Sequence, residues 1–343
     1  MLQRHEDKFI SIFWSERMEK ELMMELWKEH RKLYGPLEVR PPLKSEYPRQ
    51  SHEVVQTLIE ACLKLQDGDL HWGLTSSDVV DYVRIKQLGM TMDYVRGLMV
   101  NVQDEMDKFF ERCDVECLGY THLLPAAPVR MGRRFFHLYE SLEALKVGKP
   151  HLTFKPLSGP VGAARFETPL GGARQKWCNQ TTNGTTYMEA AFWFAQTSRI
   201  LYKFAQDLRV LLGSGELVLR SDVGSSAMAH KENPTKLERI CSLAMRQPGF
   251  VNEVWLATAT SILERTLTDS ALLRNVLPEM SHNVARQLVD FMDCLPDLNV
   301  DVKKVKSLLK AHREVRSYDD LTKLSSKVPR IDAYFLLKSK HKK

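Results

Sequence analysis

The sequence predicts an all-α protein built around an elongated central bundle of long helices, and three observations support this fold class. Apolar residues between positions 85 and 109 recur in alternating steps of three and four, which is the spacing of one face of a long helix. The strict alternation of apolar and polar residues that is typical of a half-buried strand is nearly missing. Glycine and proline, 17 and 15 in number, gather at 35–48 and 150–172, which leaves long stretches of good helix formers between them.

The longest helix is expected at 78–112. Its apolar stripe consists of Ile85, Leu88, Met92, Val95, Met99, Val102, Met106 and Phe109. At about 1.5 Å per residue such a helix is about 50 Å long. Few globular domains contain one helix of this length, so a long bundle is indicated.

Four further helices are expected, at 185–212, from 234 to the Pro248–Gly249 pair, at about 252–266 and at 270–295. Asn233 is expected to cap the second of these, and Pro234 suits its first turn because the missing proline N–H would be unpaired there anyway. The apolar faces of so many long helices exceed what one chain covers, which favours oligomerisation through the bundle.

Breaks in this pattern divide the chain into three parts. These are an N-terminal helical domain at 1–74, the central bundle with its loops at 75–298, and a small C-terminal region with a basic tail at 299–343.

Composition narrows the functional classes. Apolar residues make up 43% and charged residues 27% of the 343 residues, the balance of a soluble globular protein, and no apolar run approaches the ~20 residues of a membrane span. Charged residues interrupt the region near Met1, so a secretory leader is not expected. The net charge of +6 is too small to indicate nucleic acid, and the lysine-rich tail lacks interleaved aromatic residues. Six cysteines without a CxxC pair indicate buried thiols in the reducing cytoplasm and no metal site.

The most informative segment is GSSAMAHKENP at 224–234. It places two serine hydroxyls, the ammonium of Lys231 and the carboxamide of Asn233 just ahead of a helix start. Because a helix N-terminus is electropositive, this arrangement favours a carboxylate or the carbanion derived from one.

A second segment, HWGLTSSD at 71–78, opens the longest helix. Thr75 and Asp78 have the spacing of a capping box, and capping alone explains one hydroxyl and Asp78. Capping does not require the hydroxyls of Ser76 and Ser77, and these hydroxyls are suited to binding a carboxylate.

Two more segments carry polar groups of interest. In GYTHLLP at 119–125, His122 follows Thr121 and is expected in a loop between two helical segments, although a lone histidine is more often structural. In LERTLTDSALLR at 263–274, Arg265, Ser270 and Arg274 would form a phosphate clamp if a new helix starts near Ser270; salt bridges on an exposed helix face are the alternative.

Together the four segments resemble the fumarase/aspartase superfamily, and within it the adenylosuccinate lyase branch. The segment at 224–234 resembles the mobile catalytic loop of the superfamily, usually GSSxMPxKxNP. HWGLTSSDVVD, GYTHLLPAAP and ERTLTDSALLR are similar to the other motifs of the branch, and the resemblance covers roughly residues 1 to 300. It implies the central helical bundle of the fumarase/aspartase type and a β-elimination that releases fumarate from N6-(1,2-dicarboxyethyl)-AMP or its imidazole-carboxamide analogue.

The resemblance also implies catalytic roles. Ser225 would be the general base that removes the Cβ proton, and His122 the general acid that protonates the departing nitrogen. Lys231 and Asn233 would stabilise the carbanion and the succinyl carboxylates, and His52 would support His122 or the phosphate. No metal or organic cofactor is implied.

The remaining implied residues bind substrate. Thr75 and Ser76 would hold a carboxylate, and Gln180 would contact the substrate. The nucleotide and phosphate ligands would be Arg4, Arg239, Arg265, Ser270 and Arg274. Their neighbours in the motifs complete the expected site: His5, Ser51, Glu53, Thr121, Ser226 and Met228.

In this family three subunits of a homotetramer complete each site, so a homotetramer without nucleic-acid or membrane partners is implied. The chain departs from the pattern at Ala229, where the loop usually has proline, at His5, at Gly184, and in its reduced C-terminal region. Three alternatives stay open: another fumarate-releasing lyase of the superfamily, a modified or deoxy purine substrate, and a catalytically silent nucleotide-binding or structural paralogue.

Overall fold

The computed structural model describes residues 6–163, 166, 173–220, 224, 227–228, 230 and 232–341. Its α-helices are α1 (Lys8–Phe13), α2 (Glu16–Tyr34), α3 (Glu53–Leu65), α4 (Ser76–Arg112), α5 (Phe136–Val147), α6 (Gly184–Ser214), α7 (Thr235–Ala244), α8 (Gln247–Ala259), α9 (Thr268–Cys294), α10 (Val302–Ala311), α11 (Ser317–Ser325) and α12 (Arg330–His341). Short 3₁₀ helices are η2 (Gly132–Phe135), η3 (Gly159–Val161), η4 (Leu295–Asp297) and η5 (Arg313–Arg316).

The strands are few and short. They are β1 (Glu116–Thr121), β2 (Leu124–Arg130), β3 (Thr153–Phe154), β4 (Ala173–Arg174), β5 (Leu217–Leu219) and β6 (Leu298–Val300). β1 pairs with β2 and β5 with β6 in antiparallel fashion, while β3 and β4 are parallel. The predicted all-α class is therefore confirmed. Within the described part of the chain, none of the helices combines the length and the hydropathy that crossing a bilayer requires.

Two compact units make up the chain, and neither is continuous in sequence. Unit 1 comprises Met1–Met99, Leu145–Arg199 and Ser242–Leu288, and unit 2 comprises Val100–Ala144, Ile200–Cys241 and Val289–Lys343. The boundaries fall inside α4, α5, α6, α7 and α9. The three consecutive parts expected from the sequence remain a prediction.

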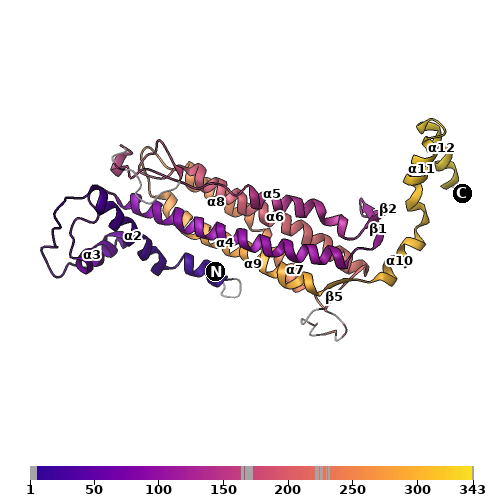
Figure 1. The fold of residues 1–343 in the computed structure, drawn as a ribbon, viewed down its shortest axis with the longest axis horizontal. Helices are drawn as coiled ribbons and strands as arrows, with labels where there is room; N and C mark the ends of the chain where they lie inside the picture. The colour runs from indigo at the N-terminus through magenta and orange to yellow at the C-terminus, as the bar shows by residue number, and fades with distance from the viewer. Residues whose placement is uncertain are drawn as a thin grey trace. The chain divides into compact units, whose positions relative to one another are not determined.

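The N-terminal helices of unit 1 pack together around an apolar cluster. α2 and α3 lie near the beginning of α4 (Figure 1). Leu26 and Trp27 of α2 are 0% exposed and belong to the same cluster as Val54 of α3 and Val79 of α4. This packing fixes the first turns of α3 and α4, which carry several of the predicted site residues.

The predicted long helix is confirmed as α4, and its apolar stripe is buried. Every stripe residue from Ile85 to Phe109 is at most 1% exposed. Continued towards the N-terminus in the same steps of four and three, the stripe reaches Asp81 and Asp78, which are 3% and 1% exposed. The buried face of α4 thus changes from apolar to charged near the beginning of the helix.

The predicted helices at 185–212 and 270–295 are confirmed as α6 and α9, whereas two predictions between them need correction. α7 begins at Thr235, and the carbonyl of Pro234, not of Asn233, accepts the first helical hydrogen bond, from Glu238. The helix predicted at 252–266 is α8, which begins and ends earlier.

The early start of α8 has a simple cause. Pro248 occupies its first turn, where no N–H is needed, so the proline starts this helix instead of disrupting one. At its other end, the hydroxyls of Thr258 and Thr260 bond back to the carbonyls of Val254 and Leu256, at 2.9 and 2.8 Å. Such hydroxyls compete with the helical ladder, which explains an end near Ala259.

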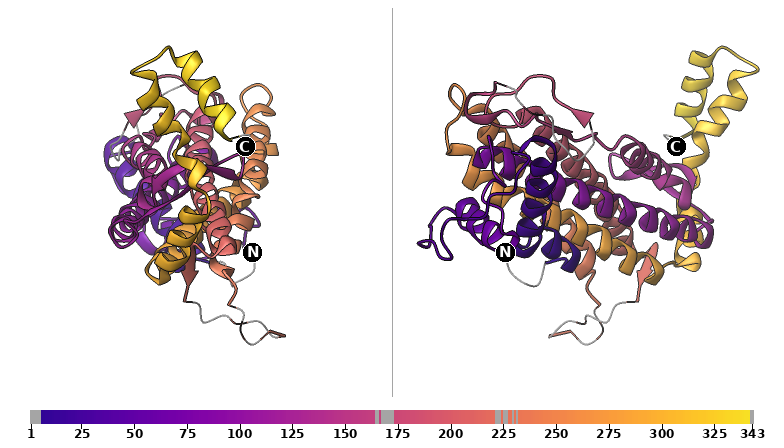
Figure 2. Two further views of the ribbon diagram at one scale, coloured as in Figure 1. Left: turned by 90° about the vertical axis from the view of Figure 1, so that its right-hand side faces the viewer. Right: turned by 60° about the vertical axis from the view of Figure 1, so that its left-hand side comes forward.

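Unit 2 contains the longest strand pair and the C-terminal helices. The β1–β2 hairpin packs against α10 and η5. α11 and α12 lie side by side, in yellow in Figure 2.

Candidate active site

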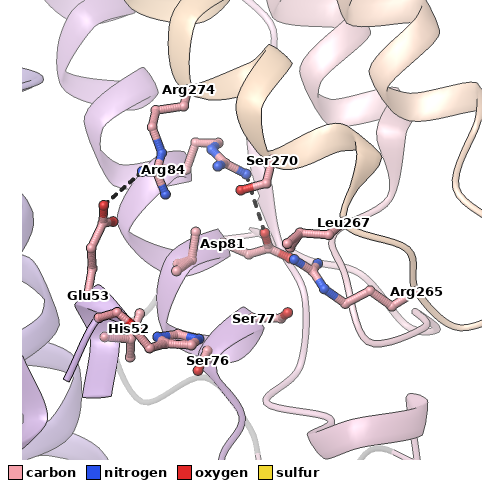
Figure 3. Close-up of a pocket in the computed structure, with 13 residues that line it drawn as sticks. His52, Glu53, Ser76, Ser77, Asp81, Arg84, Arg265, Leu267, Ser270 and Arg274 are labelled. Carbon is pink, nitrogen blue, oxygen red and sulfur yellow. Dashed lines mark hydrogen bonds and ion pairs between the residues drawn. The ribbon is translucent and has the colours of Figure 1, made fainter. Parts of the chain in front are cut away.

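The candidate site is a pocket of about 250 Å³ in unit 1. It is lined by Ser51, His52, Glu53, Val54, Ser76, Ser77, Val80, Asp81, Arg84, Arg265, Leu267, Ser270 and Arg274 (Figure 3). Seven of these residues were predicted from the sequence as site residues: Ser51, His52, Glu53, Ser76, Arg265, Ser270 and Arg274. The structure thus brings together residues that are as far apart in the chain as His52 and Arg274.

The beginnings of three helices meet at this pocket. His52 directly precedes α3, Ser76 is the first residue of α4, and Ser270 lies in the first turn of α9. The side chain of His52 makes no capping hydrogen bond to α3. Because unpaired N–H groups and the helix dipole make each N-terminus electropositive, the pocket favours an anion.

Three arginines and two carboxylates set the charge of the pocket. Nη1 of Arg274 lies 2.9 Å from Oε1 of Glu53, and these side chains are 56% and 62% exposed. Nη1 of Arg84 lies 3.8 Å from Oδ1 of Asp81. Figure 3 shows both pairs as dashed lines, with the guanidinium of Arg265 drawn next to Asp81. The three arginines and two carboxylates together carry a net charge of about +1, which suits an anionic group such as a phosphate.

Asp81 is also held in place by a backbone hydrogen bond. Its Oδ2 accepts a hydrogen bond of 2.6 Å from the backbone N–H of Thr182. Burial raises the pKa of Asp81, while the charges of Lys155 and Arg84 act in the opposite direction. The negative charge of a buried carboxylate is stable only when cationic neighbours compensate for the loss of water.

The segment before α4 uses one of its hydroxyls for capping. The backbone N–H and the hydroxyl of Thr75 both donate to Oδ2 of Asp78, at 2.8 and 2.9 Å. Oδ1 of Asp78 accepts from Lys155 and from the N–H of Ser158. The capping interpretation therefore holds for Thr75, although its hydroxyl donates to Asp78 and does not accept as in a capping box. Ser76 and Ser77 line the pocket, and the hydroxyl of Ser77 donates to Gln180; the predicted grip of these hydroxyls on a carboxylate stays a prediction.

Gln180 connects three segments of unit 1. Its Oε1 accepts a hydrogen bond of 3.3 Å from Ser77, its Nε2 donates to the carbonyl of Pro160 at 3.1 Å, and its N–H donates to the carbonyl of Glu264 at 3.3 Å. These bonds tie the segment before Arg265 to the beginning of α4. The predicted contact of Gln180 with substrate remains a prediction.

Thr121 and His122 belong to unit 2, at the tip of the β1–β2 hairpin. The expected loop between two helical segments is wrong, because the flanking segments are strands. Thr121 pairs with Leu124, and the turn consists of His122 and Leu123, whose φ angles are 54° and 61°. Positive φ is usual for Gly or Asn in such turns, and this turn contains neither, so the sequence carried no hairpin signal. The turn leaves His122 exposed.

The remaining predicted residues lie in unit 2 or outside the described residues. Arg239 makes a two-point ion pair of 2.6 and 2.5 Å with Asp290, a residue that is 0% exposed, and its assignment to phosphate stays a prediction. An antiparallel bridge joins Gly224 and Glu232, near the two ends of the predicted catalytic loop, which also contains Met228 and Asn233. Arg4, His5, Ser225, Ser226 and Lys231 lie outside the described residues. Among the residues that are described, no group of three His, Cys, Asp or Glu side chains is placed to hold a metal ion.

Sequence reasoning did not single out Asp81, Arg84 and Lys155. The first could have been found, because Asp81 continues the apolar stripe of α4 and a charged residue on a buried stripe indicates a polar site. Lys155 lies in an irregular segment, and nothing in its local pattern points to Asp78.

Comparisons with known proteins agree with this architecture. A family model described as "Lyase" matches residues 45–249. The adenylosuccinate lyase of Schistosoma mansoni is 31% identical over 273 residues, which cover 68% of this chain and 55% of that protein. That of Caenorhabditis briggsae is 27% identical over 270 residues, which cover 71% of this chain and 56% of that protein. The chain spans about half the length of the curated relatives it matches.

Solved structures show the same fold at low sequence identity. A fumarate lyase from Mesorhizobium sp. BNC1 superposes with a TM-score of 0.78 at 16% identity, covering 97% of this chain and 85% of that one. The β-carboxy-cis,cis-muconate cycloisomerase of Acinetobacter calcoaceticus sp. ADP1 gives a TM-score of 0.76 at 16% identity, covering 97% and 86%. Since the family model covers more than half of its residues, the chain belongs to this lyase family, in the fumarase/aspartase superfamily, and is similar to the adenylosuccinate lyases within it.

Proposed function

We propose that the protein is a carbon–nitrogen lyase that cleaves N6-(1,2-dicarboxyethyl)-AMP, or adenylosuccinate, into AMP and fumarate. One observation carries the proposal: Arg265, Ser270 and Arg274, implied by the adenylosuccinate lyase motif as phosphate ligands, line one pocket at the beginnings of three helices. Guanidinium groups and helix N-termini are what a phosphate monoester requires. The similarity to adenylosuccinate lyases supports the same substrate class.

The chemical step in this proposal is a β-elimination. Ser225 removes a proton from the carbon next to a succinyl carboxylate. This proton is a poor acid, because its removal places two negative charges on one group, so cations and hydrogen-bond donors must stabilise the product. Lys231 and Asn233 take this role. The serine itself must lose its proton first, and each unit by which Lys231 and nearby amides lower its pKa is worth about 1.4 kcal/mol.

His122 completes the reaction as the general acid. It transfers a proton to the departing purine nitrogen as the carbon–nitrogen bond breaks, so the electron pair of the carbanion forms the double bond of fumarate. Imidazole suits this role because its ordinary pKa, about 6.5, lies near neutral pH. His52 supports His122 or the phosphate. Ser76 holds a succinyl carboxylate, next to Thr75, whose N–H and hydroxyl donate to Asp78. The distant phosphate contributes binding energy that positions the reacting end.

The assembly is part of the proposal. A homotetramer in which three subunits contribute to each site would combine the residues of unit 1 with those of unit 2 from neighbouring copies. The substrate range extends in this proposal to the related imidazole-carboxamide nucleotide and to modified or deoxy purine analogues, since all of them carry the same phosphate and succinyl groups.

The test is direct. Purified protein is mixed with adenylosuccinate, and ultraviolet absorbance and fumarate are followed, with and without EDTA. We expect fumarate and AMP in equal amounts and no effect of EDTA, since the proposed step uses side-chain acids and bases. If adenylosuccinate releases no fumarate but a different amino-linked succinate does, the protein is another lyase of the superfamily. AMP binding without any fumarate release would identify a catalytically silent nucleotide-binding protein.

A further inference from the structure

Arg84 is a buried arginine that faces the candidate site and that no motif predicted. It lies on α4, two turns after Ser76, and is 6% exposed. It lines the same pocket as Arg265, Ser270 and Arg274. In Figure 3 its guanidinium lies on the side of the pocket where Ser270 and Asp81 are found.

The partners of Arg84 within the protein satisfy it incompletely. The ion pair with Asp81 is loose, at 3.8 Å, and Tyr187 is a second partner of the guanidinium. Burial lowers the pKa of Arg84, but the nearby Tyr187, Asp81 and Asp269 outweigh this effect, so the group is held in its charged form. A guanidinium has five N–H donors, and leaving them unused in a buried position is costly.

Asp81 is placed to orient this arginine. The N–H of Thr182 fixes Oδ2 of the carboxylate at 2.6 Å, whereas Arg84 lies nearer to Oδ1. It sits one helical turn before Arg84 on the same helix, so α4 sets the spacing of the two side chains. The carboxylate therefore attracts the guanidinium without forming a hydrogen bond to it, which leaves donors for the pocket.

We propose that Arg84 is a third guanidinium ligand of the substrate phosphate, beside Arg265 and Arg274, and that Asp81 is its positioning residue. This inference rests on the proposed function, because it takes the bound molecule to be a nucleotide monophosphate. In this proposal α4 contributes one ligand of the phosphate, Arg84, and the segment that contains Arg265 and Arg274 contributes the other two.

The test compares AMP with adenosine, which differ only in the phosphate. Calorimetric titration of the full chain is carried out for the wild type, for Arg84→Gln and for Arg96→Gln, a control that removes the same charge from an exposed position of α4. We expect Arg84→Gln to bind AMP roughly 10- to 100-fold more weakly, the loss typical of a charge-assisted hydrogen bond, with adenosine affinity unchanged. Arg96→Gln should bind both as the wild type does.

A second variant separates phosphate binding from a purely structural role. If Arg84 only neutralises Asp81, the double variant Asp81→Asn/Arg84→Gln restores both folding and AMP affinity. If Arg84 binds phosphate, the double variant folds, as judged by its melting temperature, but still binds AMP weakly. This arm also decides the matter if Arg84→Gln alone does not fold.

The outcomes are distinct from those of the proposed function. The inference is overturned if Arg84→Gln or the folded double variant binds AMP as tightly as the wild type does. It is also overturned if Arg84→Gln loses as much affinity for adenosine as for AMP, or if the wild type does not bind AMP. A wild-type protein that binds AMP through Arg84 but releases no fumarate overturns the proposed activity and leaves this inference standing.

Discussion

The carboxylate of Glu53 lies 2.9 Å from the guanidinium of Arg274, so an arginine of the candidate phosphate pocket already has an anionic partner. Glu53 begins α3 and Arg274 lies in the second turn of α9, and they are 221 positions apart in the chain. A bound phosphate and Glu53 would compete for the same guanidinium.

Replacing Glu53 by Gln should therefore tighten AMP binding. Exposed ion pairs are worth about 0.2–1 kcal/mol, so the gain is expected to reach at most about five-fold. Calorimetric titration with AMP measures it, and Glu60→Gln, on the same helix and outside the pocket of Arg274 and Ser270, is the control. Weaker binding would instead favour the sequence-based prediction that Glu53 contacts the substrate.

Replacing His122 by Asn should lower turnover about 10²- to 10⁴-fold, the usual contribution of a positioned acid. Folding should be unaffected, because His122 is exposed and its φ of 54° is a conformation that Asn adopts readily. The measurements are the rate of fumarate release and the melting temperature. Leu123→Asn, in the same turn, is the matched control and should keep a rate within a few-fold of the wild type. A fully active His122→Asn protein would remove this residue from the role of general acid.

Replacing Lys155 by Met should destabilise the fold by about 3–5 kcal/mol, since it leaves the charge of Asp78 buried without its cation. The two side chains are 3% and 0% exposed. Urea denaturation measures the free energy of unfolding. The control is Lys149→Met, which breaks the more exposed ion pair with Asp93 and should cost no more than about 1 kcal/mol. Equal losses in the two variants would mean that burial does not decide the strength of the Asp78 pair.

His71 should make stability depend on pH below neutrality. Trp27 donates its indole N–H to Nδ1 of His71 at 2.9 Å, and burial lowers the pKa of His71 to about 4. The unfolded chain, with a pKa of about 6.5, then binds a proton before the folded one does, so stability falls as the pH drops from about 6.5 to 4 and levels off below.

The size of this effect is at most about 3 kcal/mol, from the difference between the two pKa values. Urea denaturation at a series of pH values measures it. His71→Gln should flatten the curve between pH 6.5 and 4, whereas the exposed His137→Gln should leave it unchanged. An unaltered slope in His71→Gln would show that another group, such as the buried His30, dominates.

Local patterns predicted the helices and the motifs, and the failures have physical causes. The stripe from Ile85 to Phe109 predicted α4 because helix periodicity is a property of neighbouring residues. The β1–β2 hairpin was missed because its two-residue turn is built from His122 and Leu123 in place of Gly or Asn. The start of α8 was misplaced because Pro248 can either begin or break a helix, and local sequence does not distinguish the two.

By itself, the sequence determined the helical bundle, the residue types of the site and the resemblance to the lyase family. All three depend on the spacing of residues that are close together in the chain. Tertiary structure alone decided which polar groups meet: the carboxylate of Asp81 with the N–H of Thr182, Glu53 with Arg274, and Asp78 with Lys155. These partners are 77 to 221 positions apart, and their pairing depends on how helices pack, which no periodicity within one segment encodes. For the same reason Arg84, an ordinary charged residue in the sequence, became a candidate phosphate ligand only once α3, α4 and α9 were seen to begin at one pocket.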